Sequence, residues 1–120
     1  MITYRIFPVK SYLNMLSTEQ VVIGNVTFEP GCRNNWHIHK AKSGGGQMLI
    51  VTAGSGLYQE EGKPPLKLKP GDVVHIPPNV KHWHGASATE WFQHLAIEVP
   101  GEDCSTEWCE PVTDEEYKKI

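Results

Sequence analysis

Glycine and proline divide this chain into short runs that favour β-strands, and this punctuation constrains the fold more than any other feature. The 120 residues include 11 Gly and 9 Pro, most of which stand between runs rich in Val, Ile, Thr and aromatic residues. Runs that recur about every eight to twelve residues are typical of antiparallel sandwiches and barrels. The sequence therefore predicts an all-β fold, with strands over residues 21–29, 46–53, 66–69, 72–77, 80–85 and 91–99.

The length and the C-terminal segment define the rest of the architecture. A chain of 120 residues buries roughly two thirds of its unfolded surface, which is enough for one core. We therefore interpret residues 1–120 as a single domain. Only the C-terminal end has a helical pattern, because Thr113 can cap the acidic residues 114–116 and Lys118 and Lys119 suit the negative end of a helix. We expect a short helix over about 113–119.

The charge balance excludes several kinds of partner. Lys and Arg number 11 against 14 Asp and Glu, a formal charge of −3, and no basic cluster is present of the kind that binds nucleic acid or anionic lipid. No window has the roughly 20 apolar residues of a membrane span, and the start lacks a secretory signal. We expect a cytoplasmic protein with no nucleic-acid or membrane partner, in which Cys32, Cys104 and Cys109 are free thiols.

Two His-x-His pairs carry the chemistry of the sequence. His37 and His39 form the first, and His82 and His84 form the second, each in a strand-like run. Alternate residues of a strand project from the same face, so each pair can present two imidazoles, about 7 Å apart along the backbone, to one ion. A single pair is more often a solvated polar face. Two pairs on apolar strands favour a metal site, because buried imidazoles need partners.

The two pairs lie in motifs that resemble those of the cupin superfamily. The first motif, residues 31–54, contains Gly31, His37, His39, Gln47 and Gly54, and the second, residues 71–84, contains Gly71, Pro77 and His82. The similarity extends over most of 26–117 and is sharpest to the small bacterial cupins that include the manganese-dependent hydroxynitrile lyases and relatives named with carboxymuconolactone decarboxylases. It implies a double-stranded β-helix, the jelly-roll barrel of the cupins.

The same resemblance implies a metal centre made of His37, His39, Gln47 and His82. Gln47 stands where the general cupin motif has a glutamate, and residues 40–46 are longer than the corresponding turn of the hydroxynitrile lyases. A neutral amide leaves a divalent ion its full charge, which weakens binding but strengthens the polarisation of a bound oxygen. Nitrogen and oxygen ligands favour Mn or Fe as the ion bound in the cell, although Zn or Ni can bind in a purified sample. The alternative for Gln47 is a polar residue at a strand start.

Other polar residues are expected in the same cavity. His84 shares the face of His82 and is a candidate general acid or base, a role that the resemblance also implies; alternatively it holds a ligand in place. His94, Ala96 and Glu98 share one face of the run 91–99. An inward Glu98 could restore the charge that Gln47 does not supply, or accept a proton, and as a strand-end residue it could equally be solvated.

The strand before the first motif lines the pocket in the cupins that the chain resembles, which assigns Gly24 and Val26 to the pocket. His94 is assigned to the same pocket by alternation along the run 91–99. Asn34 or Asn35 is a candidate hydrogen-bond donor, and a bulge near residues 30–31 prevents the choice between them by alternation.

The tryptophans and the N-terminal segment bear on assembly. Trp36 and Trp83 are expected on the outer faces of their strands, against a second sheet or a partner subunit. Small cupins usually pair, and the apolar N-terminal strand around residues 2–7, together with the C-terminal tail, suggests a homodimer.

The leading hypothesis is a metal-dependent enzyme that performs lyase or proton-transfer chemistry on a small oxygenated molecule. The resemblance to hydroxynitrile lyases implies cyanohydrin cleavage or synthesis as a side activity and does not identify the native substrate. One alternative is an iron-dependent dioxygenase, and another is a cupin that binds a small ligand without catalysis.

Overall fold

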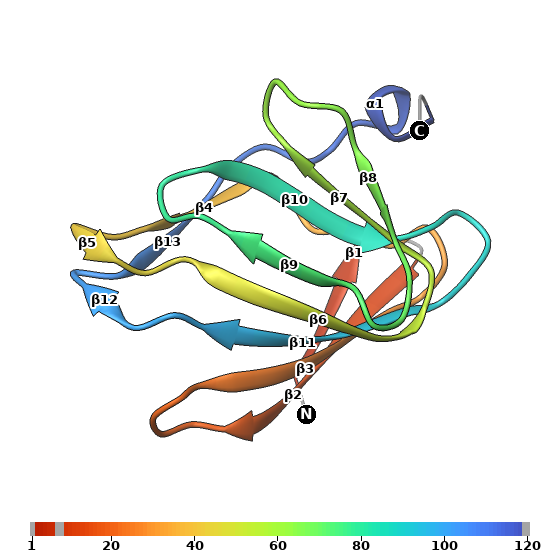
Figure 1. Ribbon diagram of the computed structural model, residues 1–120. Coiled ribbons are helices and arrows are strands. Elements are labelled where there is room, and N and C mark those ends of the chain that lie inside the picture. Colours follow the sequence, from red (N-terminus) through yellow and green to blue (C-terminus); the bar gives the residue numbers. More distant parts are fainter. Residues whose placement is uncertain (1, 7–8, 119–120) are drawn as a thin grey trace.

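The computed structural model describes residues 2–6 and 9–118, and it consists mainly of two antiparallel sheets that pack face to face (Figure 1). The six-stranded sheet has the spatial order β1 (Ile2–Ile6), β2 (Val9–Ser17), β3 (Ile23–Phe28), β11 (Phe92–Glu98), β6 (Gln47–Gly54) and β9 (Val73–Ile76). The five-stranded sheet has the order β13 (Ser105–Trp108), β4 (His37–Lys40), β10 (Lys81–Ala86), β7 (Gly56–Glu60) and β8 (Leu66–Leu68). A small ribbon pairs β5 (Ser43–Gly44) with β12 (Gly101–Glu102), and α1 (Asp114–Lys118) follows near the C-terminus.

The predicted all-β fold is confirmed. The six predicted runs correspond to β3, β6, β8, β9, β10 and β11, of which β6 and β10 extend one residue beyond the predicted ends, and the first histidine pair lies in β4. Sequence reasoning missed β2, β7, β13 and the two-residue strands β5 and β12. All four residues of β13 are exposed, so this strand lacks the apolar alternation by which strands are recognised, and its pairing with β4 defines it instead. The predicted N-terminal strand is present as β1, and Phe7 lies outside the described residues.

Alternate residues of the facing strands fill the space between the sheets. In β6, Gln47, Leu49 and Val51 are buried, and the residues between them are only half-buried. Leu49 and Val51 pack with Phe28 of β3 and Phe92 of β11 in one apolar cluster. Because Gln47 continues the inward face beyond these apolar side chains, the core becomes polar toward the start of β6. This polar end of the sandwich contains the candidate site.

The outer face of the five-stranded sheet is covered by the protein's own C-terminal segment. Trp36 and Trp83 are 6% and 0% exposed. They form a second apolar cluster with Leu57 and Val112, and Tyr117 packs against it. The tryptophans therefore lie on the outer faces, as alternation predicted, but the tail covers them in place of a second sheet or a partner subunit.

Hydrogen bonds hold this tail in position. The Arg33 guanidinium donates to the Val112 carbonyl at 3.0 Å and lies 4.3 Å from the ring centroid of Tyr117. The Tyr117 hydroxyl donates to the Ala86 carbonyl at 2.6 Å. Thr113 and Glu116 cap α1 reciprocally, since each backbone N–H donates to the other side chain at 3.1 Å. The predicted C-terminal helix is therefore present over Asp114–Lys118, and residue 119 lies outside the described part of the chain.

No helix in the described ranges is long and apolar enough to cross a membrane.

Candidate metal centre

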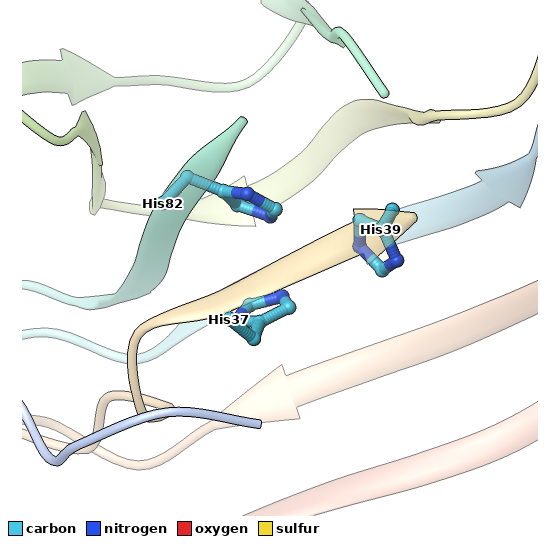
Figure 2. A group of neighbouring side chains, drawn as sticks. All are labelled: His37, His39 and His82. Carbon is cyan, nitrogen blue, oxygen red and sulfur yellow. The ribbon is translucent and has the colours of Figure 1, made fainter. Parts of the chain in front are cut away.

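Three buried imidazoles from two adjacent strands converge on a common space. His37 and His39 come from β4 and His82 from β10, and His82 is the direct cross-strand partner of His37. Their candidate ligand nitrogens all lie within 4.8 Å of one another, and Figure 2 shows the three rings around a shared space. Among the His, Cys, Asp and Glu side chains in the described residues, these three form the one group of three or more with the spacing of metal ligands.

The hydrogen bonds of these rings prepare their Nε2 atoms for a metal ion. A carbonyl oxygen can only accept, so the Nδ1 atoms of His37 and His82 must be donors to the Asn35 and Val80 carbonyls, at 2.8 and 2.9 Å. The Nε2 atoms of His39 and His82 are buried and have no hydrogen-bond partner in the described structure. An unpaired buried acceptor destabilises a fold by roughly 1–3 kcal/mol. A divalent cation would satisfy these nitrogens, so the residues present fit such an ion.

Burial also keeps the rings in the neutral form that ligation requires. Burial, reinforced by His82, lowers the pKa of His37 to about 3. Burial likewise lowers the pKa of His82 to about 4, and it lowers the pKa of His39, although the nearby Glu98 carboxylate and Gln47 amide oppose that change. At neutral pH all three rings therefore carry a lone pair and not a second proton.

Gln47 and Glu98 meet beside the histidines. They are cross-strand partners at the ends of β6 and β11, and the Gln47 Nε2 atom donates to Glu98 Oε1 at 2.7 Å. Gln47 is buried, whereas Glu98 is exposed. The sequence alone could not predict this contact, because it depends on the register between two strands.

A cavity of about 510 Å³ opens next to the imidazoles. Its lining includes His37, His39 and Gln47, but not His82. It also includes the other residues that the sequence suggested for the site, namely Gly24, Val26, Asn34, His84, His94 and Glu98. Apolar side chains form much of the remaining wall, namely Leu13, Met15, Val22, Phe28 and Ala96. A second cavity of about 600 Å³ is lined by His39 alone among the three imidazoles, so we assign the chemistry to the first.

His84 and His94 lie deeper in the same cavity. The His84 and His94 ring centroids are 4.9 Å apart, and His84 lies 5.7 Å from His37. Burial, then His94 and the other imidazoles, holds the pKa of His84 well below its ordinary value, so the ring is neutral. Asn34 accepts from the His84 backbone N–H at 2.9 Å, and its Nδ2 atom lies 3.2 Å from the His84 ring.

The two asparagines of the first motif have different positions, which alternation left open. Asn34 lines the cavity beside His84, as just described. Asn35 also lines the cavity, but its side chain donates to the Cys109 carbonyl at 3.2 Å, and its backbone carbonyl accepts a hydrogen bond from the His37 ring. Asn34 is therefore the residue in contact with the candidate acid or base.

Strand β13 supports two of the imidazoles and was missed by sequence reasoning. Trp108 stacks on His37 with ring centroids 4.7 Å apart, and Thr106 Oγ1 lies 3.4 Å from His39 Nδ1. Thr106 and Trp108 are two residues apart, the same spacing that identified the histidine pairs, and they are the cross-strand partners of His39 and His37. That two-residue spacing was the sequence signal by which Thr106 and Trp108 could have been assigned to the site.

The fold and the donor set together define a cupin with a three-histidine site. The family model described as a cupin domain matches residues 24–97, more than half of the chain, and the protein belongs to this family.

Two individual proteins are similar to this chain over most of its length. The chain is 48% identical over 95 residues to an (R)-mandelonitrile lyase from Granulicella tundricola, covering 79% of this chain and 70% of that protein. The crystal structure of a cupin-like protein from Thermotoga maritima superposes with a TM-score of 0.81 at 46% identity, covering 92% of this chain and 84% of that one. A dimethylsulfoniopropionate (DMSP) lyase from Ruegeria pomeroyi, with a TM-score of 0.70 over 87% of this chain and 54% of that chain, is 20% identical and shows the same fold.

Proposed function

We propose that this cupin is a metal-dependent enzyme that catalyses lyase chemistry on a small oxygenated substrate. The observation that carries the proposal is the convergence of three neutral imidazoles beside a cavity that also contains His84. The Nδ1 atoms of His37 and His82 donate to backbone carbonyls, so their Nε2 atoms carry the lone pairs. The similarity to an (R)-mandelonitrile lyase favours the cleavage or formation of a cyanohydrin as the reaction.

The ligands in this proposal are His37, His39 and His82 through nitrogen and Gln47 through its amide oxygen. A set of nitrogen and oxygen donors without thiolate favours Mn or Fe as the resident ion, and Zn or Ni can replace it in a purified sample. A divalent ion bound there would polarise a substrate oxygen and stabilise negative charge on it.

His84 transfers the proton in this scheme. In the cleavage direction a ring nitrogen of His84 removes the hydroxyl proton, the bond between the carbinol carbon and the nitrile carbon breaks, and the departing cyanide receives the proton. The hydrogen bonds with Asn34 hold the His84 ring in position for both steps. Leu13, Val26 and Phe28 provide an apolar wall for the substrate's side group and exclude water from the reacting atoms.

The test combines elemental analysis of the natively purified protein with activity on a panel of cyanohydrins and aldehydes, before and after removal of metal. We expect stoichiometric Mn or Fe, and cyanohydrin turnover that is lost with the metal and restored by its return. His84→Ala should retain the metal and lose turnover. His75→Ala, which changes an exposed histidine of β9, is the matched control and should retain both.

Three outcomes would contradict the proposal. A fully active His84→Ala protein would exclude the proton-transfer role. Oxygen consumption that depends on added Fe(II), without lyase activity, would favour the dioxygenase alternative. Failure of the native protein to bind a divalent metal would remove the basis for both enzymes and leave a ligand-binding cupin.

We also propose a homodimer. The C-terminal tail packs on its own sheet, which leaves the N-terminal strand as the element suited to pairing. Strand β1 is at the edge of the six-stranded sheet and has β2 as its one strand neighbour in the described structure. An unpaired edge strand favours pairing with a second chain. Sedimentation that showed only monomer would contradict this proposal.

A further inference from the structure

The hydrogen bond between Gln47 and Glu98 fixes which end of the Gln47 amide faces the histidines. The Gln47 Nε2 atom lies 2.7 Å from Glu98 Oε1. An ionised carboxylate can only accept a hydrogen bond, so it requires the nitrogen end of the amide as its partner. The carbonyl end is then directed away from Glu98. A reversed amide would bring two acceptor oxygens together, which is unfavourable.

The surroundings of Glu98 leave its charge available to this part of the cavity. In the parts of the chain that the structure describes, Glu98 forms no ion pair with lysine or arginine. Glu98 lines both cavities, at the point where they share His39 and Thr106.

We propose that Glu98 is a positioning residue for the metal centre, which holds the Gln47 carbonyl oxygen toward the three imidazoles and places a negative charge one hydrogen bond from the ligand set. This inference rests on the proposed function, in which Gln47 is a ligand. The four ligands are thus neutral, so a bound divalent ion would keep its power to polarise substrate, and the Glu98 carboxylate would compensate part of its positive charge. Gln47, which stands where the general cupin motif has a glutamate, thus has a glutamate beside it on the adjacent strand.

The experiment compares Glu98→Gln and Gln47→Ala with the parent protein by two measurements. The first is the Mn²⁺ dissociation constant, determined by competition with a chelator. The second is the visible absorption spectrum of the Co²⁺-loaded protein, which reports the ligand set. Glu98→Gln should weaken Mn²⁺ binding about 10- to 100-fold, as loss of an outer hydrogen-bond partner commonly does. Its Co²⁺ spectrum should change toward that of Gln47→Ala, because the new amide no longer selects one orientation of Gln47.

Two controls separate this role from a general structural one. Glu90→Gln removes an exposed carboxylate just before β11 and should leave both measurements unchanged. The metal-free Glu98→Gln protein should unfold at the same temperature as the metal-free parent, because the substitution keeps the shape of an exposed side chain.

The outcomes distinguish this inference from the proposed function. If Gln47→Ala leaves the Mn²⁺ dissociation constant unchanged, Gln47 is not a ligand and the proposed ligand set fails. If Gln47→Ala weakens binding but Glu98→Gln does not, only the positioning role is overturned. If Glu98→Gln binds Mn²⁺ more weakly but keeps the Co²⁺ spectrum of the parent, Glu98 affects binding through its charge alone. That result also overturns the positioning role.

Discussion

His94 tests how strongly burial controls protonation in this cavity. The side chain is 0% exposed, its Nδ1 atom donates to the Leu95 carbonyl at 3.2 Å, and its Nε2 atom has no hydrogen-bond partner among the described residues. Phe28, Phe92 and His84 contact the ring, with centroids 5.9, 5.3 and 4.9 Å away. Burial lowers the pKa of His94 from 6.5 to about 4, although the Leu95 carbonyl partly opposes this.

The sign and size of the effect on stability follow from this pKa. The unfolded chain binds a proton at His94 below pH 6.5, whereas the folded protein does so only near pH 4. The contribution of neutral His94 to the free energy of unfolding is therefore fully present above pH 6.5 and is lost as the pH falls toward 4. Each tenfold difference in proton affinity corresponds to about 1.4 kcal/mol, so His94 alone should remove about 2 kcal/mol at pH 5 and about 3 kcal/mol below pH 4.

The assay is urea unfolding of the metal-free parent and of His94→Asn, each at pH 7 and at pH 5. Asparagine cannot be protonated, and its amide can still donate to the Leu95 carbonyl. Whatever the substitution costs at pH 7, the variant should lose about 2 kcal/mol less than the parent between the two pH values. His75→Asn, at an exposed position, should lose as much as the parent. Equal losses in the parent and in His94→Asn would refute the argument that burial keeps this ring neutral.

Three further predictions concern the tail, a glycine contact and the metal. Tyr117→Phe removes the hydrogen bond to the Ala86 carbonyl and should lower the free energy of unfolding by about 1 kcal/mol in urea titrations; an unchanged midpoint would contradict it. In Gly85→Ala the new Cβ would lie 2.6 Å from the Arg33 Cα and the Cys32 carbonyl oxygen, so unfolding should require about 1–3 kcal/mol less. Unaltered stability would show that this backbone contact can relax. Mn²⁺ at 100 times its dissociation constant should raise the free energy of unfolding by about 2.7 kcal/mol, and calorimetry should find no such increase in His82→Ala.

Local patterns allowed much of the candidate site to be predicted. The spacing of His37 and His39, and of His82 and His84, fixes that each pair lies on one face of its strand, and all four side chains are buried in the structure. The same alternation identified His94 and Ala96 as inward residues of β11. The contributions of β13 could not be predicted by apolar pattern, because its residues are exposed and its position depends on pairing with β4.

Long-range contacts account for the remaining differences. Alternation put Trp36 and Trp83 on outer faces but could not identify what covers them, because their partners Val112 and Tyr117 belong to a distant segment. The choice of Asn34 over Asn35 beside His84 depends on how the segment before β4 meets β10.

The sequence by itself determined the class of fold, the strand faces and the imidazoles that could meet, since the rules for strands, turns and helix caps act between residues a few positions apart. Only the tertiary structure decided which faces share a cavity and which atom of each side chain is directed into it. Gln47 and Glu98, 51 residues apart, illustrate the difference. Their types are visible in the sequence, but the hydrogen bond that orients the amide exists only because β6 and β11 pair in this register.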